Sequence, residues 1–147
     1  MNPGQVKRHD PTDDSGQTTV LILGMVSILL MFTAVILGAT VVNADARQLL
    51  SEADGAASAA AHSAQPAPGT PQITEQQIRS AAEQHLADAG AHERHTGLTV
   101  VGAGTSPGGE TVYLQLRAEA ELPGLRWVLP ASVEITAESH ARIAISR

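Results

Sequence analysis

Residues 92–95 are the part of the sequence that most resembles a metal site. They read His92-Glu93-Arg94-His95, and imidazoles three residues apart can share one face of a helical turn. The cluster follows Gly90, which we expect to end a helix, and no set of carboxylates or thiols completes a closed site beside it. A solvated polar turn explains these residues equally well, so we predict no metal site.

Two further patterns resemble enzymatic motifs without meeting their requirements. Gly102-x-Gly104 and Gly108-Gly109 are glycine-rich, but a phosphate-binding loop stands between a strand and the amino end of a helix. Here the glycines lead into a strand, and we interpret them as a flexible hairpin loop. Serine, histidine and aspartate occur without a nucleophile elbow, and the chain has no cysteine. We predict no catalytic residue, no cofactor and no enzymatic activity.

Trp127 is the single tryptophan of the chain. It lies in the apolar stretch Leu125-Arg126-Trp127-Val128-Leu129. An indole at such a position packs in a core, anchors the chain at a membrane interface or anchors a partner. We therefore keep Trp127 as a candidate partner or interface anchor.

The elements that carry these residues follow a long apolar segment. Ser15 to Ala44 contains no charged side chain, and Val20 to Val42 is almost wholly apolar. A helix needs about 20 residues to cross the ~30 Å hydrocarbon core of a bilayer, so this run is long enough to span it. The alternative is a cleavable signal peptide, with Ala44-Asp45-Ala46 as the cleavage site. The apolar part of a signal peptide is normally ~7–15 residues long, which favours a permanent anchor.

Charge predicts the orientation and limits the partners. Lys7 and Arg8 precede the apolar run and Arg47 follows it closely, which by the positive-inside rule places the amino end in the cytoplasm. We expect a single-pass protein of the cytoplasmic membrane with residues 45–147 outside the cytoplasm. The formal net charge is −6 and no basic tract is present, which argues against nucleic-acid binding.

Changes in composition divide the chain into four parts. Residues 1–16 are polar and read as a disordered cytoplasmic stub. Residues 17–63 comprise the transmembrane helix, with its core at 20–42, and an alanine-rich helical stalk. Residues 64–72 are a linker rich in proline and glycine. Residues 73–147 form a small extracytoplasmic domain.

Small side chains recur along the predicted helix at alternating steps of three and four, which is the spacing of a helix-packing seam. Such a seam admits the close approach of two helix backbones, in the membrane and beyond it. We expect it to pack laterally against other small anchored proteins or against a second copy. The alternative is that an alanine-rich chain contains such spacings by chance. The seam comprises Ala34, Gly38, Val42, Ala46, Leu49, Ala53, Ala56 and Ala60.

The remaining sequence predicts an α+β domain with one helix on a three-stranded antiparallel sheet. Thr74 and Gln77 form a capping box and Gly90 supplies the stop, which predicts a helix over Glu75–Ala89. Apolar and polar residues alternate over 111–122 and 133–145, and less regularly over 98–103, which predicts three strands with one buried face. A core of this size without disulfides is marginal, so we expect oligomer or membrane contacts to complete it.

The amino-terminal part resembles the TadE/TadG-like pilus-assembly proteins. The resemblance rests on Ser15-Gly16-Gln17 before the apolar run, Asp45-Ala46-Arg47-Gln48-Leu49 after it, and the alanine-rich stretch 53–61. It implies a minor pilin-like component of a Tad/Flp-type pilus or secretion apparatus. Cleaved members carry glutamate five residues after the cleaved glycine, where this chain has Leu21, so it is more similar to the uncleaved TadG-like type.

A different class of function stays open beside this one. The protein is then a membrane-tethered, extracytoplasmic ligand- or metal-binding module, with His92, His95 and Trp127 as its contacts. Binding measurements with divalent metals distinguish this class from a structural one.

Overall fold

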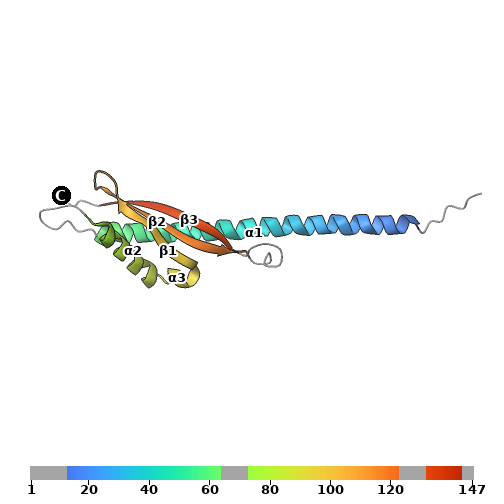
Figure 1. Ribbon diagram of the computed structural model, residues 1–147, viewed down its shortest axis with the longest axis horizontal. Helices are drawn as coiled ribbons and strands as arrows, with labels where there is room; N and C mark the ends of the chain where they lie inside the picture. The colour runs from blue at the N-terminus through green and yellow to red at the C-terminus, as the bar shows by residue number, and fades with distance from the viewer. Residues whose placement is uncertain (1–12, 64–72, 123–131, 144–147) are drawn as a thin grey trace, which may run out of the picture. The chain divides into compact units, whose positions relative to one another are not determined.

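The computed structural model describes residues 13–63, 73–122 and 132–143 (Figure 1). The chain is α+β, as predicted, with a long amino-terminal helix followed by two short helices and a three-stranded sheet. Its contacts divide it into two units, Met1–Leu37 and Gly38–Arg147. The elements are α1 (Asp13–Ser63), α2 (Glu75–Asp88), α3 (Ala91–Arg94), β1 (Thr96–Thr105), β2 (Thr111–Glu121) and β3 (Ser132–Arg142).

The sheet has the order β1-β2-β3 and is antiparallel throughout. Side chains alternate between its two faces, and on the central strand β2 the even-numbered residues from Val112 to Ala120 are buried. On β3 the odd-numbered residues Ile135, Ala137 and Ser139 are buried on the same side. The predicted alternation is therefore confirmed for β2 and β3, because each of these two strands has one apolar face that must leave water.

The sequence predicts that the hairpin loop begins at Gly104, but this residue lies within β1 and pairs with Tyr113 of β2. Gly102 also lies in β1, within the stretch 98–103 that is predicted as a strand. A Cβ atom at Gly104 would collide with the side chain of Tyr113, so the absent side chain leaves room for the aromatic ring. In the hairpin itself Gly109 has φ 69°, a left-handed conformation that glycine adopts without strain.

Helix α2 begins and ends as its sequence predicts. The Thr74 side chain accepts a hydrogen bond from the Gln77 backbone N–H, and the Gln77 side chain accepts one from the Thr74 backbone N–H. Gly90 follows the helix with φ 65°, in the left-handed conformation that ends helices. Ile78, Ala82 and Leu86 form the buried stripe of α2. The expected loop after Gly90 is instead the short helix α3, which begins at Ala91.

The second half of α1 is part of the domain core, which corrects the prediction of a separate stalk. Leu49, Ala53, Ala56, Ala57 and Ala60 are fully buried within the chain itself. They form one apolar cluster with the buried residues of α2 and of the sheet. The second half of α1 and the two shorter helices α2 and α3 therefore accompany the sheet, where the sequence predicted one helix.

Small residues make this packing possible, because they admit neighbouring elements close to the helix backbone. Gly55 lies in the same stretch of α1, and a Cβ atom there would stand 2.8 Å from Nε2 of His85 in α2. The alanine stripe and Gly55 thus fit the helix to its own domain.

The close fit predicts the effect of enlarging the buried side chains. Replacing Ala53 or Ala56 by leucine inserts volume into a filled core, and we expect each change to lower the free energy of unfolding by about 1–3 kcal/mol. The measurement is urea unfolding of the detergent-solubilised full chain. Ser51 and Ser58 are exposed on the same helix, and their replacement by leucine is the control, expected to stay within about 0.5 kcal/mol. Equal effects at both pairs would contradict the packing.

Candidate functional site

The first half of α1 exposes a continuous apolar surface that suits a hydrocarbon environment. From Gly16 to Leu37 every residue is exposed except the half-buried Ala34, and none is charged. The large exposed side chains include Leu21, Met25, Leu29 and Phe32, each more than 60% accessible. A helix satisfies all its own backbone hydrogen bonds, which is the condition for lying in hydrocarbon. Among the described residues, one helix is long enough and apolar enough to cross a membrane. It is this helix, near the amino terminus.

Two hydroxyl groups inside this run are also satisfied within the helix. The Ser27 hydroxyl donates to the Leu23 carbonyl oxygen at 2.8 Å, and the Thr33 hydroxyl donates to the Leu29 carbonyl oxygen at 2.9 Å. Bonds to the carbonyl four residues earlier remove the cost of placing a free hydroxyl in an apolar environment. Serine and threonine are therefore compatible with a membrane segment at these positions.

The predicted packing seam is divided between two environments. Its last four members, Leu49, Ala53, Ala56 and Ala60, are fully buried by the domain, so no neighbouring helix can contact them in this fold. Of the first four, Ala34, Val42 and Ala46 are half-buried and Gly38 is buried. The expectation of lateral packing along the whole seam is therefore wrong for its last four members.

Two polar contacts join α1 to the domain beside the alanine stripe. The Ser139 hydroxyl on β3 donates to a carboxylate oxygen of Asp54 at 2.5 Å. Arg94 of α3 forms an ion pair with Glu52 of α1, and its guanidinium also donates to the Ala89 carbonyl oxygen at 2.6 Å. Glu52 is the better buried partner, with 14% of its side chain accessible. Glu52 and Asp54 of α1 thus each bind a different element of the domain, α3 and β3.

Sequence reasoning missed these partners, although one signal was present. Ser139 is a polar residue at a position where the alternation of β3 requires a buried side chain. A buried hydroxyl needs a hydrogen-bond partner, and the sequence cannot show that the partner lies 85 residues away in α1.

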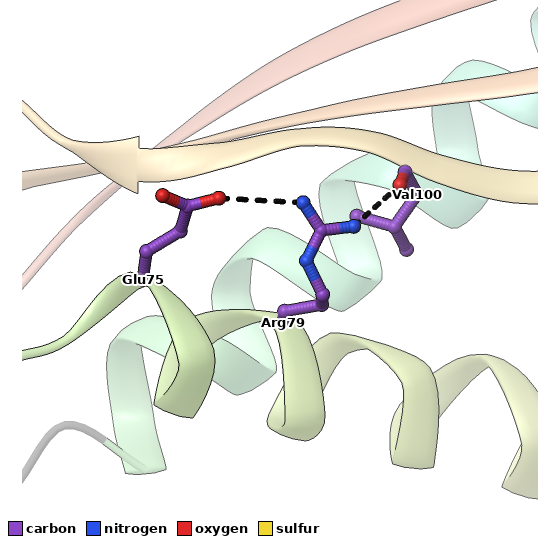
Figure 2. A network of polar contacts seen from close by, with 3 residues as sticks. All are labelled: Glu75, Arg79 and Val100. Carbon is purple, nitrogen blue, oxygen red and sulfur yellow. Dashed lines mark hydrogen bonds and ion pairs between the residues drawn. The ribbon is translucent and has the colours of Figure 1, made fainter.

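A third polar contact holds α2 to the sheet. Arg79 donates from Nη1 to the Val100 carbonyl oxygen at 2.6 Å and from Nη2 to Glu75 at 3.3 Å, as Figure 2 shows. The pairing of β1 with β2 shifts register between Val100 and Gly102, so this carbonyl stands at an irregularity of the strand. The guanidinium satisfies an oxygen at an irregular part of the sheet edge.

The histidine cluster does not converge on a shared site. His92 is exposed on α3, whereas His95 is 6% accessible, and its Nε2 has no hydrogen-bond partner among the described residues. Within residues 13–63, 73–122 and 132–143 no three side chains of histidine, cysteine, aspartate or glutamate are grouped as metal ligands. The two imidazoles that the sequence placed on one turn therefore lie in different environments, one in solvent and one buried. Trp127, the candidate anchor, lies outside the described residues.

Comparison with known proteins adds no relative to this description. No family model, no curated protein and no solved structure matches the chain.

The contact between α1 and β3 yields a quantitative prediction. Replacing Asp54 by alanine leaves the buried Ser139 hydroxyl without its acceptor, and we expect a loss of about 1–3 kcal/mol in the free energy of unfolding. Replacing Ser139 by alanine removes the need for that acceptor. In the S139A background the Asp54→Ala change should therefore cost clearly less, measured by urea unfolding as a double-mutant cycle. Additive effects of the two changes would show that the contact contributes no coupling.

Proposed function

We propose that the protein is a membrane-anchored structural or assembly component, minor pilin-like, of a Tad/Flp-type pilus or secretion apparatus. The observation that carries the proposal is that the two parts of α1 have different surroundings. Residues 16–37 expose an uncharged apolar surface, and the buried face of the same helix between Leu49 and Ala61 belongs to the core of the domain. The resemblance of residues 15–63 to TadE/TadG-like proteins supports the same role.

This role depends on contacts between helices rather than on catalysis. In a bilayer, helices associate through close packing of small residues, since lipid and protein side chains are equally apolar. The domain already covers the seam from Leu49 to Ala60, so helix packing with neighbours is confined to the apolar part around Ala34. The proposed neighbours are other small anchored proteins of the apparatus or a second copy.

The proposed location is the cytoplasmic membrane, with the amino end in the cytoplasm and residues 45–147 outside. Lys7 and Arg8 on the amino side outnumber Arg47 on the carboxyl side, which supports this direction of insertion.

Protease protection tests the orientation. Tags are placed at Met1 and at Arg147, and protease is added to intact spheroplasts of the expressing bacterium. We expect loss of the tag at Arg147 and protection of the tag at Met1. The opposite pattern would overturn the orientation, and a soluble product beginning near Arg47 would instead support a cleaved signal peptide.

Site-specific photocrosslinking in cells tests the assembly role. Leu30 lies one turn before Ala34 on the same helix face, so a photoreactive residue at position 30 should capture small single-helix membrane proteins, identified by mass spectrometry. We expect Ala34→Leu to reduce this crosslinking several-fold, because the larger side chain holds the helices apart. Ala39→Leu is the matched control, since position 39 is exposed and lies about 140° further around the helix.

The competing class of function gives a different pattern. If position 30 captures no protein, and the full chain in detergent binds zinc at micromolar concentration by calorimetry, the protein is a tethered metal-binding module. Crosslinks to other small anchored proteins without zinc binding support the assembly role.

A further inference from the structure

The two edges of the sheet differ in how they are protected. The edge at β1 carries two register shifts, is flanked by α2 and α3, and has its Val100 carbonyl oxygen bound by Arg79 (Figures 1 and 2). Bulges and covering helices are the devices by which proteins prevent strand addition at an edge. The β1 edge is therefore a poor template for another strand.

The edge at β3 has the opposite character. Its pairing with β2 runs from Thr111↔Arg142 to Glu121↔Ser132 without a shift in register. It contains no proline, lysine or glycine. Among the described residues no side chain donates to or accepts from the backbone of β3. A long, regular and uncovered edge is able to accept a further strand.

The hydrogen bonds show which residues of β3 face outward. Ile143 donates its backbone N–H to the Glu110 carbonyl oxygen, and pairs that exchange hydrogen bonds alternate along an antiparallel ladder. The odd-numbered residues of β3 therefore bond to β2, and the even-numbered residues from Ser132 to Arg142 direct their backbone N–H and C=O groups away from the sheet. Among the described residues, no neighbouring strand pairs with this row of backbone donors and acceptors.

The side chains beside this row favour a basic partner. Glu134 and Glu138 stand on the open face of β3, and Glu119 and Glu121 stand on the same face of β2, with Glu119 directly opposite Glu134. Arg117 pairs with Glu134 at 3.3 Å, His140 lies 3.3 Å from Glu138, and Arg142 stands at the end of the same face, so the four glutamates outnumber two arginines there. Two like charges opposite one another destabilise a sheet unless cations lie close to them. Lysine or arginine side chains on an added strand would place cations close to these glutamates.

The other face of the edge favours apolar residues on that partner. Val133 is 41% accessible, and Ala141 and Ile143 are half-buried, so the core is incompletely covered along β3. Alternate side chains of an added strand would point to this face and cover it.

We propose that the outer edge of β3 binds an extended segment of a partner protein by strand addition, and that this segment alternates basic and apolar residues. Backbone hydrogen bonds supply the affinity and the two rows of side chains supply the selection, as in other cases of strand addition. A second copy of this chain fits less well, because its own β3 carries the same glutamates. The proposal does not depend on the pilus assignment.

A synthetic peptide tests the proposal with the full chain in detergent. The probe is a fluorescein-labelled peptide of about the length of β3 in which lysine and valine alternate, and binding is read by fluorescence anisotropy. We expect saturable binding to the wild type. Thr136→Pro removes one outward N–H without changing charge or the bonds to β2, and should weaken binding by about tenfold or more. Thr136→Val keeps the N–H and is the matched control, expected to bind like the wild type.

Two further measurements separate the backbone ladder from simple charge attraction. Glu134→Gln with Glu138→Gln should weaken binding several-fold and reduce its dependence on salt. A peptide methylated at alternate backbone nitrogens should not bind, and this result does not require the proline variant to fold. Equal binding of the Thr136→Pro and Thr136→Val proteins, both with wild-type unfolding temperatures, would overturn the proposal, as would full binding of the methylated peptide. Concentration-dependent self-association that Thr136→Pro abolishes would replace the partner by a second copy.

Discussion

The fold depends on the packing of one small-residue face of α1 against the sheet and α2. A small domain made of a three-stranded sheet and α2 alone would bury little apolar surface, and such a domain is only marginally stable. Leu49, Ala53 and Ala56 of α1 add to the apolar core that α2 and the sheet form. The free energy of the hydrophobic effect is thus gained within one molecule, without a partner subunit.

This packing gives α1 two surfaces with different solvents. The part from Gly16 to Leu37 is uncharged and bare, and suits a hydrocarbon environment. From Leu49 to Ala61 one face of the helix is buried by the domain, and the acidic residues Glu52 and Asp54 beside that face bind Arg94 and Ser139. Contacts with neighbours are then left to the apolar part of the helix and to the surface of the domain.

The two edges of the sheet differ in how well they can contact another protein. The β1 edge is irregular and is covered by α2 and by the Arg79 contact, whereas the β3 edge is regular and bordered by glutamates. This asymmetry follows from chain order. The helices α2 and α3 lead directly into β1, and they lie beside the strand they precede, while β3 is the last strand of the sheet.

Local periodicity along the chain is enough to predict several elements of this fold. The apolar run predicts a helix able to span a bilayer, the Thr74 and Gln77 capping box with Gly90 predicts α2, and alternation predicts the buried faces of β2 and β3. Each depends on neighbouring residues, whose spacing in the chain fixes their direction in space. The strand bounds were less exact, because β1 extends beyond the apolar residues that signalled it.

Only the tertiary structure decided what the small-residue face of α1 contacts. Alanine at steps of three and four suits a neighbouring helix and a sheet equally well, so the pattern could not distinguish assembly between chains from packing within one. The partners of Asp54 and Arg79, and the unequal burial of His92 and His95, depend likewise on residues distant in sequence. Such contacts are set by how the elements pack together, and no local pattern in the chain encodes them.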